Sequence, residues 1–396
     1  MARLIIVGGS LGGLFAANIL HRAGHDVVVL EKSADGLDGR GAGIVTHAPL
    51  VTALQRAGAT VDDRFCVAVM SRVALDASGH CSARLALPQV LTSWSRLYQM
   101  LRDVLPAGCH HAGATVAQVR EDDNGVHAHC HDGRIFSGEL LIASDGLRSV
   151  IRAQFAPDAQ AQYAGYVGWR GVCEENVLSR FTRDSIFDCF GFGMPDGEQL
   201  IGYPVAGAHN STAPGQRRFN FVWYRPAHDA GALQALLSDA DGQHYRLGIP
   251  PNKVDWRHVA AMRLAARTLL APQFAEIIEK TAQPFLQPIF DMTSEQIAFG
   301  RVVLMGDAAF VARPHVGMGV TKAAQDAMAL ADSIARYGAT TDAAKAYQAL
   351  RLQVGQAIVA RGRQLGSYME RCHLSGSPRD AMQVLRDTAV DVEVSV

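Results

Sequence analysis

The chain has 396 residues, of which 48% are hydrophobic and 19% charged, so it can form a globular protein of two or three domains. Its 37 basic and 38 acidic residues leave a net charge of −1, which argues against nucleic acid or an anionic membrane as a partner. No apolar run is long enough for a membrane span or a signal peptide, and the seven cysteines form no CxxC pair, so we expect a cytoplasmic protein with free thiols.

The first stretch, "RLIIVGGSLGGLFAANILHRAGHDVVVLEK", predicts one βαβ unit. A continuous apolar run at residues 4–7 is typical of a buried strand, and the apolar residues that follow recur at helical spacing until Gly24. A second strand is expected at residues 26–30, closed by Glu31.

The turn of this unit, "GGSLGG", indicates a dinucleotide site rather than a plain glycine turn. Gly8 and Gly13 occupy the first and third glycine places of the fingerprint, whereas Ser10 stands in the second. The helix N-terminus supplies amide donors for a diphosphate, and Glu31 is placed to accept hydrogen bonds from a ribose. The predicted nucleotide contacts are Gly8, Ser10, Leu11, Gly13, Glu31 and Lys32.

Two further motifs each follow an apolar run. "ELLIASDGLRSVIR" leads from a predicted strand at residues 140–143 into Asp145, and taken alone it is typical of a strand followed by a capped helix start. "RVVLMGDAAFVARPHVGMGV" leads from a predicted strand at residues 301–307 through a segment rich in glycine and proline to a helix at residues 320–337.

These three motifs, in this order, resemble the class A flavoprotein monooxygenases, whose pattern is GxGxxG, then DGxxSxxR, then GDAAH with PxxGxG. The resemblance implies bound FAD, NADH or NADPH as a transient reductant with NADH favoured, and O2. It also implies a flavin C4a-hydroperoxide that hydroxylates a small, electron-rich aromatic substrate. The stretches "YAGYVGWRGV", "LTSWSRLYQML", "LIGYPVAG" and "RPHVGMG" resemble the pyridine-ring hydroxylases of the family, so the expected substrate is a hydroxylated pyridine such as 2,6-dihydroxypyridine.

The resemblance assigns roles to the third motif. Asp307 would hydrogen-bond the ribityl chain, and Pro314 would shape the wall beside flavin C4a. The glycines would let the backbone approach the ring, and the following helix would aim its N-terminus at flavin N1 and O2. The predicted flavin contacts are Arg40, Asp145, Asp307, Pro314, Gly317, Met318 and Gly319, where Arg40 could equally be a solvated loop arginine.

The chain departs from the family pattern at three places. Phe310 stands where the family has histidine, Met318 where it often has glutamine, and Trp94 where it usually has arginine. Each change removes a possible polar contact to the flavin but none of the backbone features that would bind it.

Candidates for the catalytic base come from residue type and place. Ring hydroxylation is helped by a base that deprotonates a phenol-like substrate, and histidine or tyrosine suits that task near neutral pH. The predicted catalytic residues are His47, His315, Tyr203 and Tyr224, for each of which ordinary packing is an equally good explanation. Trp223 and Tyr224 should face opposite sides of one strand, so only one of them can point inward.

A cluster of histidines in "VHAHCH" invites a metal interpretation. His127, His129 and His131 would share one face of a strand, but the segment lies between two turn-like stretches, as a hairpin strand would. No carboxylate is clearly placed to complete a site, so we predict no metal.

The expected fold is α/β, with a Rossmann-like FAD-binding domain of the para-hydroxybenzoate hydroxylase type and a largely antiparallel β-sheet substrate domain. The FAD domain would be discontinuous, at residues 1–71, 95–164 and 291–396, and the substrate domain would take residues 72–94 and 165–290. The amphipathic C-terminal helices could support a homodimer.

Two rival functions use a similar nucleotide domain. The first is a flavin reductase or oxidase, but a disulfide reductase would need a redox cysteine pair, and DGxxSxxR with PxxGxG argues against an amine oxidase. The second is a non-catalytic binding protein, against which the glycines for close flavin approach argue.

Overall fold

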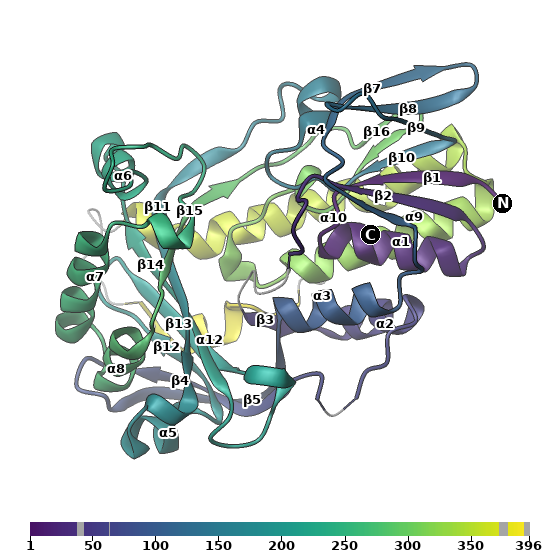
Figure 1. Cartoon of the computed structure of the whole chain (residues 1–396). Helices are drawn as coiled ribbons and strands as arrows, with labels where there is room; N and C mark the ends of the chain where they lie inside the picture. The colour runs from purple at the N-terminus through teal and green to yellow at the C-terminus, as the bar shows by residue number, and fades with distance from the viewer. Residues whose placement is uncertain (38–42, 63, 372–378, 392–396) are drawn as a thin grey trace.

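The computed structural model describes residues 1–37, 43–62, 64–371 and 379–391, with the side chains of residues 370 and 371 left out. Two large sheets dominate this part of the chain (Figure 1). The six-stranded sheet has the order β16 (Ala298–Phe299), β17 (Val302–Leu304), β10 (Leu140–Ala143), β1 (Arg3–Val7), β2 (Asp26–Glu31) and β6 (His110–Ala112).

The six-stranded sheet confirms the predicted Rossmann-like unit. All neighbouring pairs are parallel except the edge pair of β16 and β17. The strand expected at residues 301–307 is shorter than predicted, because the backbone turns into a 3-10 helix at Gly306–Ala308. Figure 1 shows α1 (Leu11–Arg22) and α9 (Gly319–Tyr337) on one side of the sheet. A small sheet of β7 (Val116–Asp122), β8 (Gly125–Cys130) and β9 (Ile135–Gly138) lies on the other.

The eight-stranded sheet confirms the predicted substrate sheet. Its order is β15 (Phe285–Asp291), β11 (Gln162–Glu174), β14 (Arg218–Pro226), β13 (Gln199–Val205), β12 (Cys189–Gly193), β4 (Val67–Leu75), β5 (Cys81–Ser93) and β3 (Gly43–Thr46). Every pair is antiparallel except β12 with β4. The division into two domains by residue range stays a proposal. It places β3 and the first half of β4 apart from the sheet to which they belong.

The remaining helices of more than one turn are α2 (Ala48–Arg56), α3 (Trp94–Asp103), α4 (Val150–Phe155), α5 (Arg180–Ile186), α6 (Ala230–Leu236), α7 (Trp256–Leu269), α8 (Pro272–Lys280), α10 (Thr341–Gly366), α11 (Tyr368–Arg371) and α12 (Ala381–Asp387).

Helices α7 and α8 cover the outer face of the eight-stranded sheet. Trp223 packs in the outer core with Met262 of α7 and Phe274 of α8. Tyr224 packs on the inner face with Tyr166, which confirms that the two neighbours point to opposite sides.

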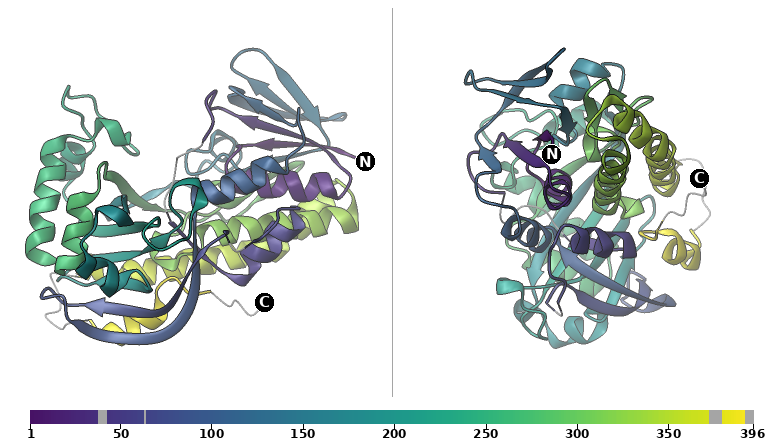
Figure 2. Two further views of the ribbon diagram at one scale, coloured as in Figure 1. Left: turned by 60° about the horizontal axis from the view of Figure 1, so that its bottom comes forward. Right: turned by 90° about the vertical axis from the view of Figure 1, so that its right-hand side faces the viewer.

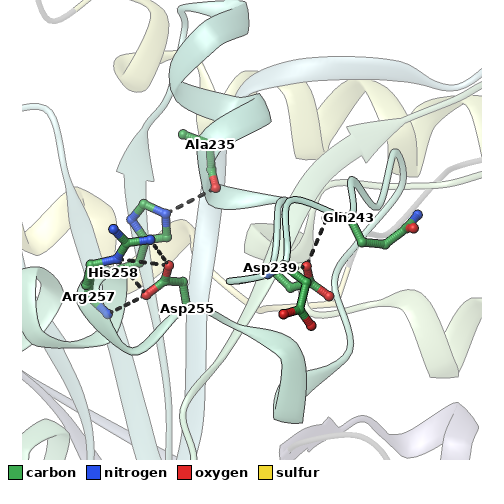
Figure 3. Close-up of polar contacts among 7 residues, drawn as sticks. Ala235, Asp239, Gln243, Asp255, Arg257 and His258 are labelled. Carbon is green, nitrogen blue, oxygen red and sulfur yellow. Dashed lines mark hydrogen bonds and ion pairs between the residues drawn. The ribbon is translucent and has the colours of Figure 1, made fainter.

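Carboxylates fix the segment that connects β14 to α7 (Figure 3). Asp239 accepts a hydrogen bond from the Gln243 amide at 2.9 Å, which closes a tight loop. Asp255 caps α7 by accepting from the Arg257 amide at 2.8 Å, and the His258 ring lies 3.1 Å from the Ala235 carbonyl. These contacts hold the outer helices in place and leave the inner face of the sheet free for a site.

The C-terminal segment returns to the β4–β5 hairpin, against which α12 lies (Figure 2). Arg72 of β4 is fully buried and donates to the carbonyl oxygens of Leu385 at 2.6 Å, Thr388 at 2.5 Å and Ala389 at 3.1 Å. Carbonyl groups at a helix C-terminus have no hydrogen-bond donor within the helix, and the Arg72 guanidinium supplies the missing donors. The last described residues are thereby fixed beside the inner face of the sheet.

Candidate functional site

The three sequence motifs meet at one edge of the six-stranded sheet. They follow β1, β10 and β17, whose carboxyl ends lie side by side because the strands are parallel. The Ser144 amide donates to the Val7 carbonyl at 2.8 Å, and the Met305 amide donates to the Ala143 carbonyl at 2.9 Å. This edge is where open α/β sheets bind ligands.

Two glycines of the first motif are required by close backbone approach. A Cβ on Gly8 would lie 2.3 Å from the Ser144 carbonyl oxygen, and the Gly8 φ of +105° disfavours any other residue. A Cβ on Gly13 would lie 1.9 Å from the Gly8 carbonyl oxygen. The turn, the second motif and the start of α1 therefore form one closely packed unit.

The first of two cavities opens beside this turn and has a volume of about 260 Å³. Four of the predicted nucleotide contacts, Gly8, Ser10, Glu31 and Lys32, line it together with Asp145. Leu11 and Gly13 lie in the first turn of α1 and are not among the lining residues. The sequence had not singled out Arg148, which also lines this cavity; Trp94, noted only as a departure, does so too.

Glu31 shapes the loop as well as lining this first cavity. Its carboxylate is buried and accepts from the Gly9 amide at 2.7 Å and from the Ser33 amide at 2.8 Å. Both carboxylate oxygens therefore have backbone partners already, and a ribose would share them.

The middle motif connects the first motif to the third. Ser149 caps α4 by accepting from the Arg152 amide at 2.8 Å, as ordinary capping predicts. The Arg152 guanidinium also donates to the Leu147 carbonyl at 2.5 Å and to the Ala308 carbonyl at 3.2 Å, inside the third motif. Asp145 keeps one carboxylate oxygen buried without a partner, and burial raises the pKa of its carboxyl.

The second cavity, of about 300 Å³, lies between the third motif and the eight-stranded sheet. Asp307, Pro314, Gly317 and Gly319 form its floor, as the predicted flavin seat requires. Met318 is buried below the floor, and Arg40 lies outside the described residues. Helix α9 begins here without a side-chain cap, so its N-terminal amides are available to an acceptor and favour negative charge.

The roof of the second cavity is the inner face of the sheet. In one row, Arg170 of β11 is paired with Val222 of β14, and Val222 with Ile201 of β13. Tyr203 and Tyr224 line the same roof. Burial raises the pKa of both tyrosine hydroxyls, so both stay protonated near neutral pH and act as hydrogen-bond donors rather than bases.

His315 does not line the second cavity, and its ring packs against Tyr166 and Tyr224 of the eight-stranded sheet. It is 1% exposed, its Nε2 lies 2.9 Å from the Tyr166 hydroxyl, and its ring centroid lies 4.1 Å from that of Tyr224. Burial, with the charges of Arg313 and Arg379, lowers the pKa of His315 to about 3. The 3-10 turn at Pro314–Val316 turns Pro314 and Val316 to the cavity and His315 away from it. This geometry argues against His315 as the base.

His47 lies apart from the other predicted catalytic residues. It precedes α2, its Nδ1 lies 3.0 Å from the Thr321 hydroxyl, and it lines a separate cavity together with Gln89 and Asp391. Burial lowers the pKa of His47. The structure therefore brings Tyr203 and Tyr224 together at the second cavity and leaves both histidines outside it.

Several residues of the second cavity were missed in the sequence. Arg170 and Gln287 lie on neighbouring strands, and Phe190 comes from β12. Ala389 reaches the cavity from the C-terminal segment, where its amide donates to the His315 carbonyl at 2.9 Å. The stretch "GWRG" contained a signal for Arg170, since an arginine in an apolar strand is unusual, but nothing around Ala389 marked it.

The residues of the two cavities fit FAD. A glycine turn at a helix N-terminus suits a diphosphate. One carboxylate oxygen of Asp145 is buried without a hydrogen-bond partner, so it can accept a hydrogen bond from a bound ligand. The two cavities lie on either side of the adjacent residues Gly146 and Leu147, so one extended dinucleotide can reach both. Among the described residues, no group of three or more His, Cys, Asp or Glu is placed to hold a metal.

Comparisons with known proteins point to the same cofactor. An FAD binding domain-like family model matches residues 163–291. The chain is 29% identical to 2,6-dihydroxypyridine 3-monooxygenase of Paenarthrobacter nicotinovorans over 369 residues, 93% of this chain and 91% of that protein. It is 28% identical to 3-amino-4-hydroxybenzoate 2-monooxygenase of Streptomyces cremeus over 403 residues, 98% of this chain and 92% of that protein.

A solved structure agrees over the whole chain. The structure of 2,6-dihydroxypyridine-3-hydroxylase from Arthrobacter nicotinovorans superposes with a TM-score of 0.90 and 28% identity, covering 100% of this chain and 99% of that one. The likeness therefore extends from the sequence to the whole fold. The sequence relatives, the solved structure and the family model together support an FAD-dependent aromatic monooxygenase of class A.

Proposed function

We propose that this monooxygenase hydroxylates a hydroxylated pyridine such as 2,6-dihydroxypyridine, with O2 as oxygen donor and NADH or NADPH, preferably NADH, as reductant. The observation that carries the proposal is the second cavity, which sets two tyrosine hydroxyls and a guanidinium opposite the predicted flavin seat. The names of the relatives support the choice of a pyridine.

The chain's own residues would divide the work between the two cavities. When bound, FAD would supply the chemistry that accepts hydride and activates O2. Gly8, Ser10 and Glu31 would hold the nucleotide half, and Asp307 would hold the ribityl chain. The N-terminus of α9 would stabilise negative charge beside the ring, while the apolar walls exclude water.

Tyr203 and Tyr224 would orient the substrate. Both are buried in the roof and protonated, so each can donate a hydrogen bond to an oxygen or nitrogen of a small aromatic ring. Orientation of the ring relative to the flavin selects the carbon atom that is hydroxylated.

The test is substrate-stimulated turnover of the purified FAD-loaded protein. Addition of 2,6-dihydroxypyridine should accelerate NADH oxidation by at least about tenfold and give a product that carries one atom from ¹⁸O2, detected by mass spectrometry. Stimulated NADH oxidation that yields only hydrogen peroxide would contradict hydroxylation of this substrate. NADPH, assayed in parallel, tests the preference for NADH.

Two further properties remain part of the proposal. A cytoplasmic location is proposed from the scattered cysteines, of which the six in the described residues are all free thiols. A homodimer is proposed from the amphipathic C-terminal helices and is tested by sedimentation. No helix of the described residues is long and apolar enough to cross a membrane.

A further inference from the structure

The second cavity contains one cation that no carboxylate neutralises. The Arg170 side chain reaches the cavity from β11, where Nη1 donates to the Gln287 side-chain oxygen at 2.7 Å. Its Nε is buried and has no hydrogen-bond partner. Among the described residues no carboxylate forms an ion pair with this guanidinium, so a buried N–H donor is left for a ligand.

Four other charged or titratable side chains line the cavity. They are Tyr203, Tyr224, Asp307 and Arg313. Arg313 donates to Asp291 at 2.7 Å, and Arg363 pairs with the same carboxylate at 2.6 Å. The charges that act on Asp307 come from Lys322, Asp326 and Arg152, below the floor.

The charge of Arg170 is felt inside the roof. It lowers the pKa of the Tyr203 and Tyr224 hydroxyls, although burial outweighs this effect and leaves both values raised. A weakly acidic hydroxyl on a substrate, placed nearer to the guanidinium and less desolvated than the tyrosines, would be ionised by the same field.

Apart from Asp307, which would hold the ribityl chain, no side chain in the cavity is suited to remove a proton from the substrate. His315 and His47 do not line it, and Tyr203 and Tyr224 are protonated donors. A hydroxylated ring becomes a better nucleophile when it carries an oxyanion, so the enzyme needs an ionised substrate from some source. An arginine without a carboxylate partner can select the ionised form of the substrate from solution.

We propose that Arg170 determines specificity by binding the substrate as a preformed monoanion, with the ring oxyanion or an equivalent anionic oxygen at its Nε. The substrate class is therefore an acidic hydroxylated aromatic ring whose proton leaves to bulk water before binding. This inference rests on the proposed function, since it specifies the charge of the substrate of the same site.

The test measures ligand affinity in the oxidised FAD-loaded enzyme without reductant. The dissociation constant of 2,6-dihydroxypyridine is followed from pH 4 to 9 by the change in flavin absorbance, beside its neutral isostere 2,6-diaminopyridine at pH 8. In the natural enzyme, affinity should rise as pH increases through the free ligand's own pKa and then become constant. Arg170→Met should weaken binding of the anion about 100-fold and binding of the diamine less than about threefold.

Matched variants separate charge from packing. Arg170→Lys keeps a positive charge and should retain the pH dependence with intermediate affinity. Arg218→Met is the control, because Arg218 lies on β14, pairs with Glu174 at 2.6 Å and does not line the cavity. FAD content and melting temperature report folding. If Arg170→Met does not fold, Arg170→Gln takes its place in the same titration.

Two outcomes overturn the proposal. One is an Arg170→Met enzyme that binds the anion as tightly as the natural enzyme, and the other is tighter binding of the neutral form. If 2,6-dihydroxypyridine does not bind at any pH, the proposed pyridine substrate is wrong, and 4-hydroxybenzoate is compared with 4-hydroxybenzamide. Preference for the carboxylate that Arg170→Met abolishes supports the anion site, and equal binding of the two overturns it.

Discussion

The cavity beside Gly8 and the cavity below Tyr224 are assembled in different ways. The first is lined mainly by short segments that follow parallel strands, and its shape depends on backbone atoms such as those that meet at Gly8 and Ser144. The second gathers side chains from six strands of one sheet, the loop before α9 and the C-terminal segment. A substitution should therefore affect the first cavity through the backbone and the second through contacts between distant parts of the chain.

The largest effect is expected from Gly8→Ala in the first cavity. The added Cβ meets the Ser144 carbonyl at 2.3 Å, and φ of +105° is unfavourable for alanine, so the turn must shift. We expect a cost of about 3 kcal/mol or more and FAD affinity on the order of 100-fold weaker. Titration of the apoprotein with FAD measures the affinity.

The control for this prediction is Gly24→Ala. Gly24 also has a positive φ, of +89°, but a Cβ there would meet no atom within 4 Å. Only the backbone strain of about 1 kcal/mol should appear, with FAD affinity unchanged. Equal effects of the two substitutions would show that strain, and not the contact with the second motif, accounts for Gly8.

The second prediction tests the long-range assembly of the other cavity. Arg72→Met removes the buried donor of the last helix carbonyls and should destabilise the protein by about 3 kcal/mol. Because Ala389 lines the cavity, substrate affinity should fall while FAD affinity is retained. Chemical denaturation measures the stability, and limited proteolysis reports release of the C-terminal segment.

Arg84→Met serves as the matched control. Arg84 is exposed on the same hairpin and donates to the Ser71 hydroxyl at 3.0 Å without touching the C-terminal segment. Its loss should change stability by less than about 0.5 kcal/mol. If the Arg72→Met protein has the stability and substrate affinity of the natural protein, the C-terminal segment does not contribute to substrate binding in the second cavity.

The third prediction concerns His315, whose pKa is lowered to about 3 by burial. The unfolded chain binds a proton at this residue below about pH 6.5 and the folded protein does not, so stability is complete above pH 6.5 and falls as pH drops towards 3. Between pH 7.5 and 5, His315 alone should contribute a loss of about 2 kcal/mol. Urea denaturation at the two pH values measures it.

The His315→Gln variant should lose this contribution of about 2 kcal/mol to the pH dependence of stability, whereas His80→Gln, at an exposed residue, should keep it. Since His315 stays neutral above about pH 3, no limb of the kcat/KM profile near pH 6–7 should depend on it. A limb in that range that His315→Gln abolishes would restore the role of base that the sequence suggested.

The same difference between the cavities explains how far the sequence could be interpreted. Gly8, Glu31, Asp145 and Asp307 were predicted because each follows a strand within a short motif, and parallel strands bring their carboxyl ends together. That Trp223 and Tyr224 face opposite sides of one strand also followed from the period of two, although the period did not indicate which of them points inward. In both cases local spacing determines position.

Arg170 and His315 show where such prediction ends. Spacing placed His315 beside Pro314 but could not indicate that a single 3-10 turn directs its ring away from the cavity. Arg170 donates a hydrogen bond to Gln287, which lies far along the chain. The two residues meet only because β11 and β15 pair in the sheet. Whether a polar side chain binds a ligand or a neighbour depends on these long-range contacts, which spacing does not contain.

The smallest effect is expected from Glu31→Gln in the first cavity. The carboxamide keeps the shape but has a single acceptor oxygen, so it can keep only one of the two hydrogen bonds from the Gly9 and Ser33 amides, at 2.7 and 2.8 Å, and without the charge. We expect FAD affinity to fall about tenfold, or about 1.4 kcal/mol. Glu139→Gln is the control, because Glu139 accepts from the Arg3 amide at 2.6 Å outside the cavity. If both substitutions lower stability but only Glu31→Gln lowers FAD affinity, the Glu31 carboxylate acts on the nucleotide and not merely on the loop.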